Sequence, residues 1–156
     1  MIYSYGLFWR EDQVFWGKPN KSGSLLGSAS QSKKAIPVDF REQRGIYALY
    51  ADYDLIYIGQ TGARNADRLF NRLKTHTTDH LAERWNRFSW FGTEWVKKNH
   101  ELSSEKDGVH EGIPDSLNIL EAVAIAIAEP KLNLQRGKWS KVKKYFQFID
   151  RNLKDL

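Results

Sequence analysis

The chain of 156 residues contains no cysteine, which excludes disulfides and thiolate metal sites. Its first residues lack a basic region followed by an apolar run, so no secretory signal can be read. The longest nearly apolar stretch, Ile119–Ala128, is interrupted by Glu121 and has about half of the roughly 20 residues that a membrane span needs. No glycine-rich phosphate-binding motif occurs, so no nucleotide cofactor is expected. We expect a cytoplasmic protein without membrane attachment.

The composition is that of one folded domain with a basic end. Hydrophobic residues make up 41% of the chain and aromatic residues 13%, enough for a substantial core. The net charge is +5, and residues 131–156 hold eight basic and two acidic side chains, which leaves the rest of the chain slightly acidic. Such a basic segment suits a polyanion such as nucleic acid. A solvated, lysine-rich helix face would have the same composition.

Apolar alternation predicts several strands. Aromatic and polar residues alternate from Tyr3 to Trp16, which indicates a hairpin, whereas residues 18–37 show no period and are predicted to form a loop. Gly45–Tyr50 and Leu55–Gly59 predict a second hairpin, and Phe88–Trp95 predicts a third strand for the same sheet. Three antiparallel strands are therefore expected in the centre of the chain.

Helical spacing predicts the remaining elements. Leu69, Leu73 and His76 recur at helical intervals after a cap at Asn65 or Asp67. A short helix is expected over residues 80–86, and a longer one from Asp115 or Ser116 to Glu129, before a proline. Residues 97–114 are predicted to be a polar loop. The steps of three and four from Trp139 to Leu153 predict a basic, amphipathic C-terminal helix.

Two tripeptides, Gly45-Ile46-Tyr47 and Tyr57-Ile58-Gly59, are separated by nine residues and followed by the predicted helix that carries Arg72. This combination resembles the catalytic core of the GIY-YIG nuclease superfamily. The resemblance implies an α/β (α+β) fold with a small three-stranded antiparallel sheet flanked by helices. The whole chain would be a single domain with its core at about 44–134, an N-terminal hairpin extension over 1–43 and a basic C-terminal helix over 135–156.

The resemblance also implies a metal-dependent DNA endonuclease that leaves 5′-phosphate and 3′-hydroxyl ends on double-stranded or branched DNA. Tyr47 would lie near the attacking water as its general base, but a normal tyrosine pKa near 10 means that it needs help from a cation or only orients the water. Tyr57 would contact the same phosphate or water. Arg72 would clamp the phosphate, and it is chosen over Arg68 because some restriction enzymes of this superfamily have a histidine, here His76, four residues after the arginine.

Glu121 and Asn133 complete the predicted site. Glu121 is a carboxylate in an otherwise apolar stretch, which is costly unless it is paired or metal-bound. It matches the superfamily's metal-binding glutamate, and the metal would be Mg²⁺ or Mn²⁺. Glu121 could instead face solvent or pair with an arginine of the earlier helix. Asn133 would hold the site loop or contact the substrate, and it would equally suit an ordinary turn.

Further basic residues are expected to contact DNA without reading its sequence. The predicted nucleic-acid-binding residues are Arg68, Arg72, Lys74, Lys138, Lys141, Lys143 and Lys144. Two other functions stay open at this point. A catalytically inactive nucleic-acid-binding module would keep the fold and the basic surface, and a protein-interaction domain would use the tyrosines only as core residues.

Overall fold

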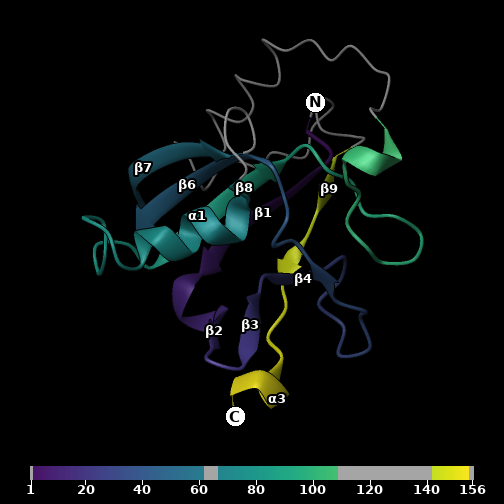
Figure 1. The fold of residues 1–156 in the computed structure, drawn as a ribbon, viewed down its shortest axis with the longest axis horizontal. Coiled ribbons are helices and arrows are strands. Elements are labelled where there is room, and N and C mark those ends of the chain that lie inside the picture. The colour runs from purple at the N-terminus through teal and green to yellow at the C-terminus, as the bar shows by residue number, and fades with distance from the viewer. Residues whose placement is uncertain (1, 62–66, 109–141, 155–156) are drawn as a thin grey trace.

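The computed structural model describes residues 2–61, 67–108 and 142–154 (Figure 1). A five-stranded sheet with the strand order β7-β6-β8-β1-β9 forms its centre. These strands are β1 (Ser4–Arg10), β6 (Gly45–Ala51), β7 (Asp54–Thr61), β8 (Arg87–Gly92) and β9 (Lys143–Lys144). All neighbours pair antiparallel except β1 and β9, which run parallel.

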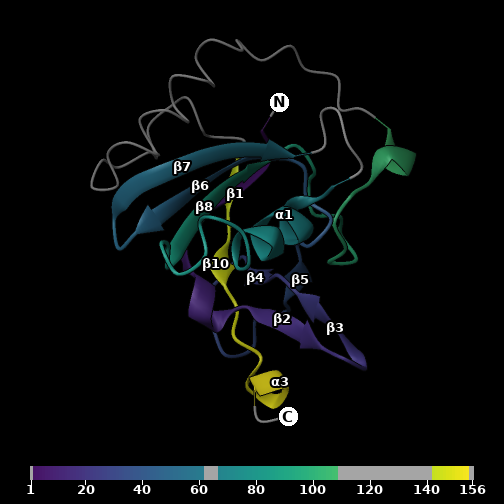
Figure 2. The same cartoon turned by 60° about the vertical axis from the view of Figure 1, so that its left-hand side comes forward.

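Two smaller sheets and short helices accompany the main sheet. β2 (Phe15–Lys18) pairs with β3 (Lys21–Ser24), while β4 (Leu26–Ser28) lies between β10 (Phe146–Gln147) and β5 (Val38–Asp39). The helices within the described ranges are α1 (Leu69–His76) and α3 (Arg151–Lys154), with short 3₁₀ turns at Glu11–Gln13 and Glu105–Asp107. In Figure 2, α1 and the small sheets lie on the same side of the main sheet. No helix among the described residues has the length and apolar character needed to cross a membrane.

The main core lies between the sheet and α1. Alternate strand residues face the same side of a sheet, which brings Tyr47 and Leu49 of β6 together with Trp90 of β8. Leu69 and Leu73, four residues apart on one face of α1, pack against them. All five side chains are at most 1% exposed. Burying each large apolar side chain contributes about 1.5–3 kcal/mol, so this layer fixes α1 on the sheet.

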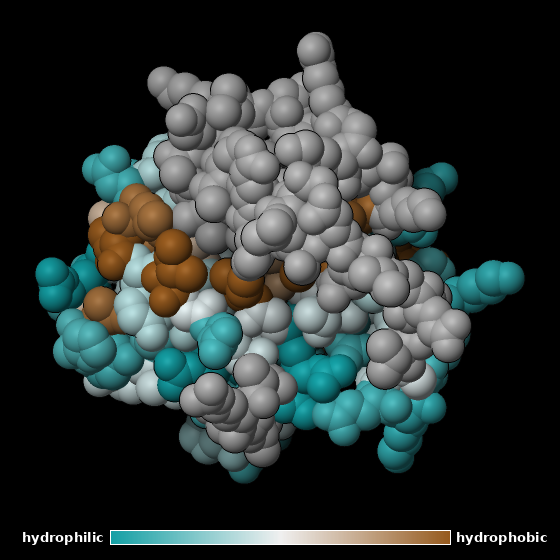
Figure 3. All heavy atoms as spheres, turned by 90° about the horizontal axis from the view of Figure 1, so that it is seen from above, coloured by the Kyte–Doolittle hydropathy of each residue, from teal (hydrophilic) through white to brown (hydrophobic). Residues whose placement is uncertain are grey.

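The opposite face of the sheet is less completely buried. Ala48, Tyr50 and Phe91 form a second apolar cluster there. Ile56 and Ile58 of β7 remain 39% and 54% exposed, and Figure 3 shows apolar side chains gathered on this side of the molecule. The two faces of the sheet therefore differ, with one closed by α1 and the other exposing apolar positions on β7.

The predicted three-stranded sheet flanked by helices is wrong. The central hairpin, the third strand and the helix at Leu69–His76 are confirmed, but β1 and β9 extend the sheet to five strands, and strands dominate the described residues. The aromatic alternation of residues 3–16 correctly indicated strands but not their partners. β1 pairs with β8, about 80 residues later, and β2 pairs with β3 inside the predicted loop of residues 18–37. Alternation reveals a strand's exposed and buried sides, but its partner depends on distant residues.

The predicted basic C-terminal helix over 135–156 is wrong for most of its described residues, of which only α3 is helical, and residues 135–141 lie outside the described residues. Residues 143–147 are extended, and the Lys143 and Tyr145 amides donate to the carbonyls of Tyr3 and Tyr5 at 3.0 and 2.8 Å. Tyr145, which is absent from the predicted apolar stripe, is 4% exposed and packs against Phe40. The residues extend instead of forming a helix because the edge of β1 supplies hydrogen-bond partners for the backbone of this segment.

The remaining helix predictions fare differently. Residues 80–86 form turns, a bend and an irregular connection to β8 instead of a helix. Arg68, rather than Asp67, occupies the N-cap position of α1 and makes no side-chain capping bond. Asn65 and the helix predicted to end at Glu129 lie outside the described residues.

Replacing Tyr145 tests the docking of the C-terminal segment on β1. Tyr145→Ala should lower the free energy of unfolding by about 3–5 kcal/mol, because it leaves a cavity beside Phe40. Lys143→Ala, at an exposed neighbouring position, should change it by less than about 0.5 kcal/mol. Urea denaturation of both variants measures the difference, and equal small effects would show that this segment does not dock.

Candidate active site

The register of β6 and β7 brings the two motifs together. Tyr47 lies opposite Gly59 and Leu49 lies opposite Tyr57, so both tyrosines face α1, with ring centroids 6.1 Å apart. A Cβ atom at position 59 would overlap the ring and hydroxyl of Tyr47. Gly59 therefore leaves the space that the Tyr47 side chain occupies. The glycine of the second motif is needed by the tyrosine of the first.

Gly45, the glycine of the first motif, meets a different constraint. Its φ of +145° is a conformation that L side chains rarely adopt, and a Cβ there would collide with the Phe91 carbonyl on β8. Gly45 thus permits the close approach of β8 that begins the pairing of the two strands. The fold therefore requires glycine at both motif positions for steric reasons.

The last residue of α1, His76, contacts Tyr47, the tyrosine of the first motif. Leu69, Leu73 and His76 follow one face of the helix, so His76 is drawn into the same interior and is only 2% exposed. Its Nε2 atom lies 2.7 Å from the Tyr47 hydroxyl, and its ring centroid lies 4.9 Å from that of Tyr57. Trp85 fixes the end of the helix by donating its indole N–H to the His76 carbonyl at 3.0 Å.

Asp79 holds the other side of the imidazole. Its Oδ2 atom lies 2.8 Å from His76 Nδ1, and its Oδ1 atom accepts the Leu81 amide at 2.8 Å. Burial opposes ionisation of this carboxyl, but the Leu81 hydrogen bond and the interactions with His76 and His80 outweigh it and hold the pKa of Asp79 below its usual value. An ionised Asp79 accepts the Nδ1 proton of His76, which leaves Nε2 to accept the proton of the Tyr47 hydroxyl.

This carboxylate, imidazole and hydroxyl form a continuous hydrogen-bonded chain, the arrangement that activates hydroxyl groups in nucleophilic and acid–base catalysis. Burial raises the pKa of Tyr47 to about 12, although the hydrogen bond and charge of Arg72 act to lower it. Tyr47 is therefore a neutral hydroxyl at physiological pH. It can take up a proton from another group only as it passes its own proton to His76.

Arg72 lies one helical turn before His76 and is half-buried. Its guanidinium interacts with the Tyr47 hydroxyl, which raises the pKa of Arg72 above its already high normal value. Its Nε atom is buried and has no hydrogen-bond partner in the part of the chain that the structure describes. An unsatisfied buried donor is costly, and an anionic oxygen would satisfy it.

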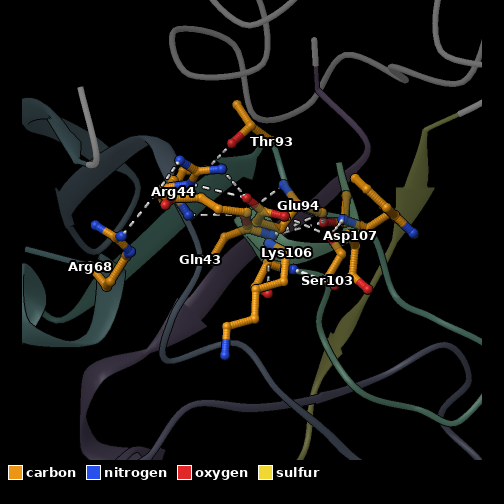
Figure 4. Close-up of polar contacts among 12 residues, drawn as sticks. Gln43, Arg44, Arg68, Thr93, Glu94, Ser103, Lys106 and Asp107 are labelled. Carbon is orange, nitrogen blue, oxygen red and sulfur yellow. Dashed lines mark hydrogen bonds and ion pairs between the residues drawn. The ribbon is translucent and has the colours of Figure 1, made fainter. Parts of the chain in front are cut away.

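Arg68 belongs to a separate polar network, shown in Figure 4. There the carboxylate of Glu94, 3% exposed, accepts from the guanidinium of Arg44 and from Ser103 Oγ at 2.6 Å. Glu105 lies 3.1 Å from Arg44 and 3.5 Å from Arg68. The network borders a cavity of about 250 Å³ beside the start of β6. Its internal pairing suits a structural role, fastening residues 94–107 to the main sheet.

The structure places the other predicted site residues apart from the tyrosines or does not describe them. Lys74 and Lys143 are exposed, and the Lys144 ammonium lies 5.2 Å from the centre of the Phe146 ring. Glu121, Asn133, Lys138 and Lys141 lie outside the described residues. Within residues 2–61, 67–108 and 142–154, no group of three or more His, Cys, Asp or Glu side chains could hold a metal ion. The described residues alone therefore do not provide the predicted Mg²⁺ or Mn²⁺ site.

Sequence reasoning missed Asp79 and Glu94. Asp79 stands three residues after His76, a spacing that places two side chains on one side of a turn and that could have signalled the pair. Glu94 is the only acidic residue within the aromatic run from Phe88 to Trp95, which is the signal of a buried carboxylate. No family model, curated protein or solved structure matches this chain. Its function is therefore inferred from its own residues.

The raised pKa of Tyr47 predicts a loss of stability in alkali. An unfolded tyrosine titrates near pH 10, so the contribution of Tyr47 is complete below about pH 10 and is lost as the pH rises towards 12. The loss from this one residue is at most about 2–3 kcal/mol. Denaturation at several alkaline pH values should show a shallower decline for Tyr47→Phe than for the native chain. Tyr53→Phe, at a tyrosine that is 54% exposed, should decline like the native chain, and an equal slope in all three would contradict the burial of the Tyr47 hydroxyl.

The contact between the two motifs predicts a coupled pair of substitutions. Gly59→Ala should cost about 1–3 kcal/mol of unfolding free energy, because the added methyl displaces the Tyr47 ring. In a Tyr47→Leu background the same change should cost at least about 0.5 kcal/mol less. Coupling energies between residues in contact are usually about 0.5–3 kcal/mol. Gln60→Ala, at the exposed neighbouring position, is the control. Additive costs at 59 and 47 would show that the two motifs do not meet.

Proposed function

We propose that this protein is a metal-dependent DNA endonuclease that hydrolyses phosphodiester bonds to 5′-phosphate and 3′-hydroxyl ends. One observation carries the proposal: the Tyr47 hydroxyl is held 2.7 Å from His76 Nε2, with the guanidinium of Arg72, whose Nε donor is unsatisfied among the described residues, and the ring of Tyr57 beside it. The GIY-YIG resemblance and the basic C-terminal segment support the same function. The protein would act in the cytoplasm on double-stranded or branched DNA.

The proton path follows from the hydrogen-bonded chain. A water that attacks phosphorus must lose a proton, and Tyr47 can accept it as its own hydroxyl proton moves to His76 Nε2. The carboxylate of Asp79 stabilises the imidazolium that results. This path removes the difficulty of a tyrosine base with a pKa of about 12, because Tyr47 never has to carry a full negative charge.

Arg72 supplies charge to the phosphate. Its guanidinium stays protonated and offers several donors in one plane, and the buried Nε donor has no partner among the described residues. A phosphate oxygen that reaches the half-buried guanidinium gains a charge-assisted hydrogen bond that strengthens as charge develops in the transition state. A Mg²⁺ or Mn²⁺ ion bound through Glu121 would add Lewis-acid polarisation of the phosphate and help the departing oxygen. Asn133 would hold the loop of the site.

Access to the site comes from the side of Tyr57 and Arg72. Tyr47 and His76 are almost wholly buried, whereas Tyr57 and Arg72 are half-buried. A scissile phosphate would therefore contact Arg72 and Tyr57 at the surface, with the proton path leading inward from Tyr47. The exposed Lys74 on α1 adds a cation on the same helix.

The burial of Tyr47 also favours a second candidate, a nucleic-acid-binding module of the same fold without catalysis. In such a protein the chain from Tyr47 to Asp79 would serve only to stabilise the core. Binding would then be electrostatic and strongly salt-dependent, with no requirement for a divalent ion.

Cleavage of plasmid and branched DNA in Mg²⁺ or Mn²⁺ tests the two candidates. The native chain should cut, Arg72→Gln should be slower by about 10²–10³-fold, and Glu121→Gln or removal of metal should abolish cutting. Lys98→Gln, at an exposed position, should cut normally. A native chain that binds DNA but never cuts would support the binding module. Equal cutting by Glu121→Gln would refute the assignment of the metal ligand.

Asp79→Asn tests the proton path. The amide keeps a hydrogen-bonding group beside His76 but removes the charge that stabilises the imidazolium, so kcat should fall by at least tenfold while KM changes little. Asp79→Glu should restore part of the rate. A normal kcat for Asp79→Asn, in a variant with native thermal stability, would exclude His76 as the proton acceptor.

A further inference from the structure

A second candidate site lies apart from the tyrosines, in an open groove of about 760 Å³. It is enclosed by the end of β1, the residues after β4, the start of β8 and the chain from β9 to α3. Figure 2 shows β10 beside β4, with the C-terminal segment continuing to α3. The lining includes Phe8, Arg10, Lys33, Arg87, Lys144 and Phe146, and it contains none of the candidate site residues Tyr47, Tyr57, Arg72, His76 and Asp79.

The groove is strongly cationic. Its lining holds Arg10, Lys33, Arg87, Lys144 and Arg151 against one acid, Asp150. Among the described residues, the only ion pair of these five cations joins Arg10 to Asp12 at 2.8 Å, and both partners are about half exposed. Arg10 and Arg87 are also direct partners in the β1–β8 ladder, where like charges destabilise a sheet. An anion bound between them would relieve this repulsion.

Aromatic rings accompany the cations. The Lys144 ammonium lies 5.2 Å from the centre of the Phe146 ring, and the Arg87 guanidinium lies 4.9 Å from that of Tyr53, which is 54% exposed. Phe8 has a φ of +53°, unusual for a bulky residue, at an irregularity in the β1–β8 register. This backbone brings its ring within 5.3 Å of the Tyr53 ring, beside Arg87. Irregularities of this kind re-aim side chains next to functional surfaces.

We propose that this groove binds one strand of nucleic acid. Bases stack on Phe146 and Phe8 of the groove lining, while Lys144, Arg87 and Lys33 neutralise the phosphates, the combination by which proteins hold single strands. The volume lies within the range of about 300–1,000 Å³ found for small-molecule pockets, which is room for a nucleotide or two. The role of the groove rests on the proposed nuclease function. In that function, the groove would make branched DNA with a single-stranded arm the favoured substrate.

Fluorescence anisotropy with a labelled oligothymidylate of about 12 nucleotides tests the groove directly. The full chain is used in EDTA, so that binding is measured without cleavage. Arg87→Gln combined with Lys144→Gln should weaken binding at least tenfold and reduce the salt slope by about 0.7 for each lost phosphate contact. The matched control combines Lys18→Gln with Lys98→Gln, two exposed lysines outside the groove, and should bind like the native chain.

Phe146→Leu separates stacking from charge. Leucine keeps an apolar side chain but not the aromatic face, so affinity should fall about fivefold or more with an unchanged salt slope. Thermal unfolding of each variant checks that the fold is intact. The proposal is overturned if the groove and control variants bind equally, or if a duplex of the same length binds more tightly than the single strand.

The two proposals fail in different ways. If the native chain binds the single strand through the groove but cuts no DNA, the groove proposal is supported and the nuclease proposal is refuted. If the native chain cuts branched DNA and the groove variants bind and cut like the lysine control, the groove proposal is refuted and the nuclease proposal is supported.

Discussion

The pairing of β6 with β7 is the constraint on which the rest of the site depends. It sets Gly59 opposite Tyr47, so that the ring and hydroxyl of Tyr47 occupy the space that a Cβ atom at position 59 would fill. A shift of this register by one residue would turn every side chain of β7 to the other face and put Ile58 or Ile56 where Tyr57 now lies. The contact between Tyr47 and His76 requires this register and also the docking of α1 through Leu69 and Leu73.

The proposed site would have to reconcile burial with catalysis. A tyrosine with a pKa of about 12 is a poor base in isolation, and the apolar layer that raises this pKa also positions the groups that compensate for it. His76 is buried with its two ring nitrogens both engaged, one by Tyr47 and one by Asp79. In the proposed mechanism, proton transfer along this chain would separate little charge within the core, because the imidazolium would form beside a carboxylate whose pKa is held low.

The periodicity of apolar residues predicted the elements that depend on contacts between residues near each other in the sequence. The alternation of residues 45–59 gave the central hairpin, and the spacing of Leu69, Leu73 and His76 gave α1. The strand order was beyond reach, because the pairing of β1 with β8 and β9 joins residues far apart in the chain. Asp79 was missed because it lies in a turn after the end of α1, where only its spacing of three residues from His76 could have signalled the contact. The C-terminal helix failed because a sheet edge satisfied the backbone of residues 143–147 better than helical spacing indicated.

The protonation of His76 is the most direct test of this account. Nitrogen-15 NMR of the imidazole distinguishes a protonated ring nitrogen from an unprotonated one, and the hydrogen bond to Asp79 requires the proton on Nδ1 with Nε2 free to accept from Tyr47. The account predicts this tautomer in the neutral imidazole and its loss in Asp79→Asn. A neutral imidazole protonated on Nε2 would donate to Tyr47 instead of accepting from it, and this result would contradict the proposed proton path.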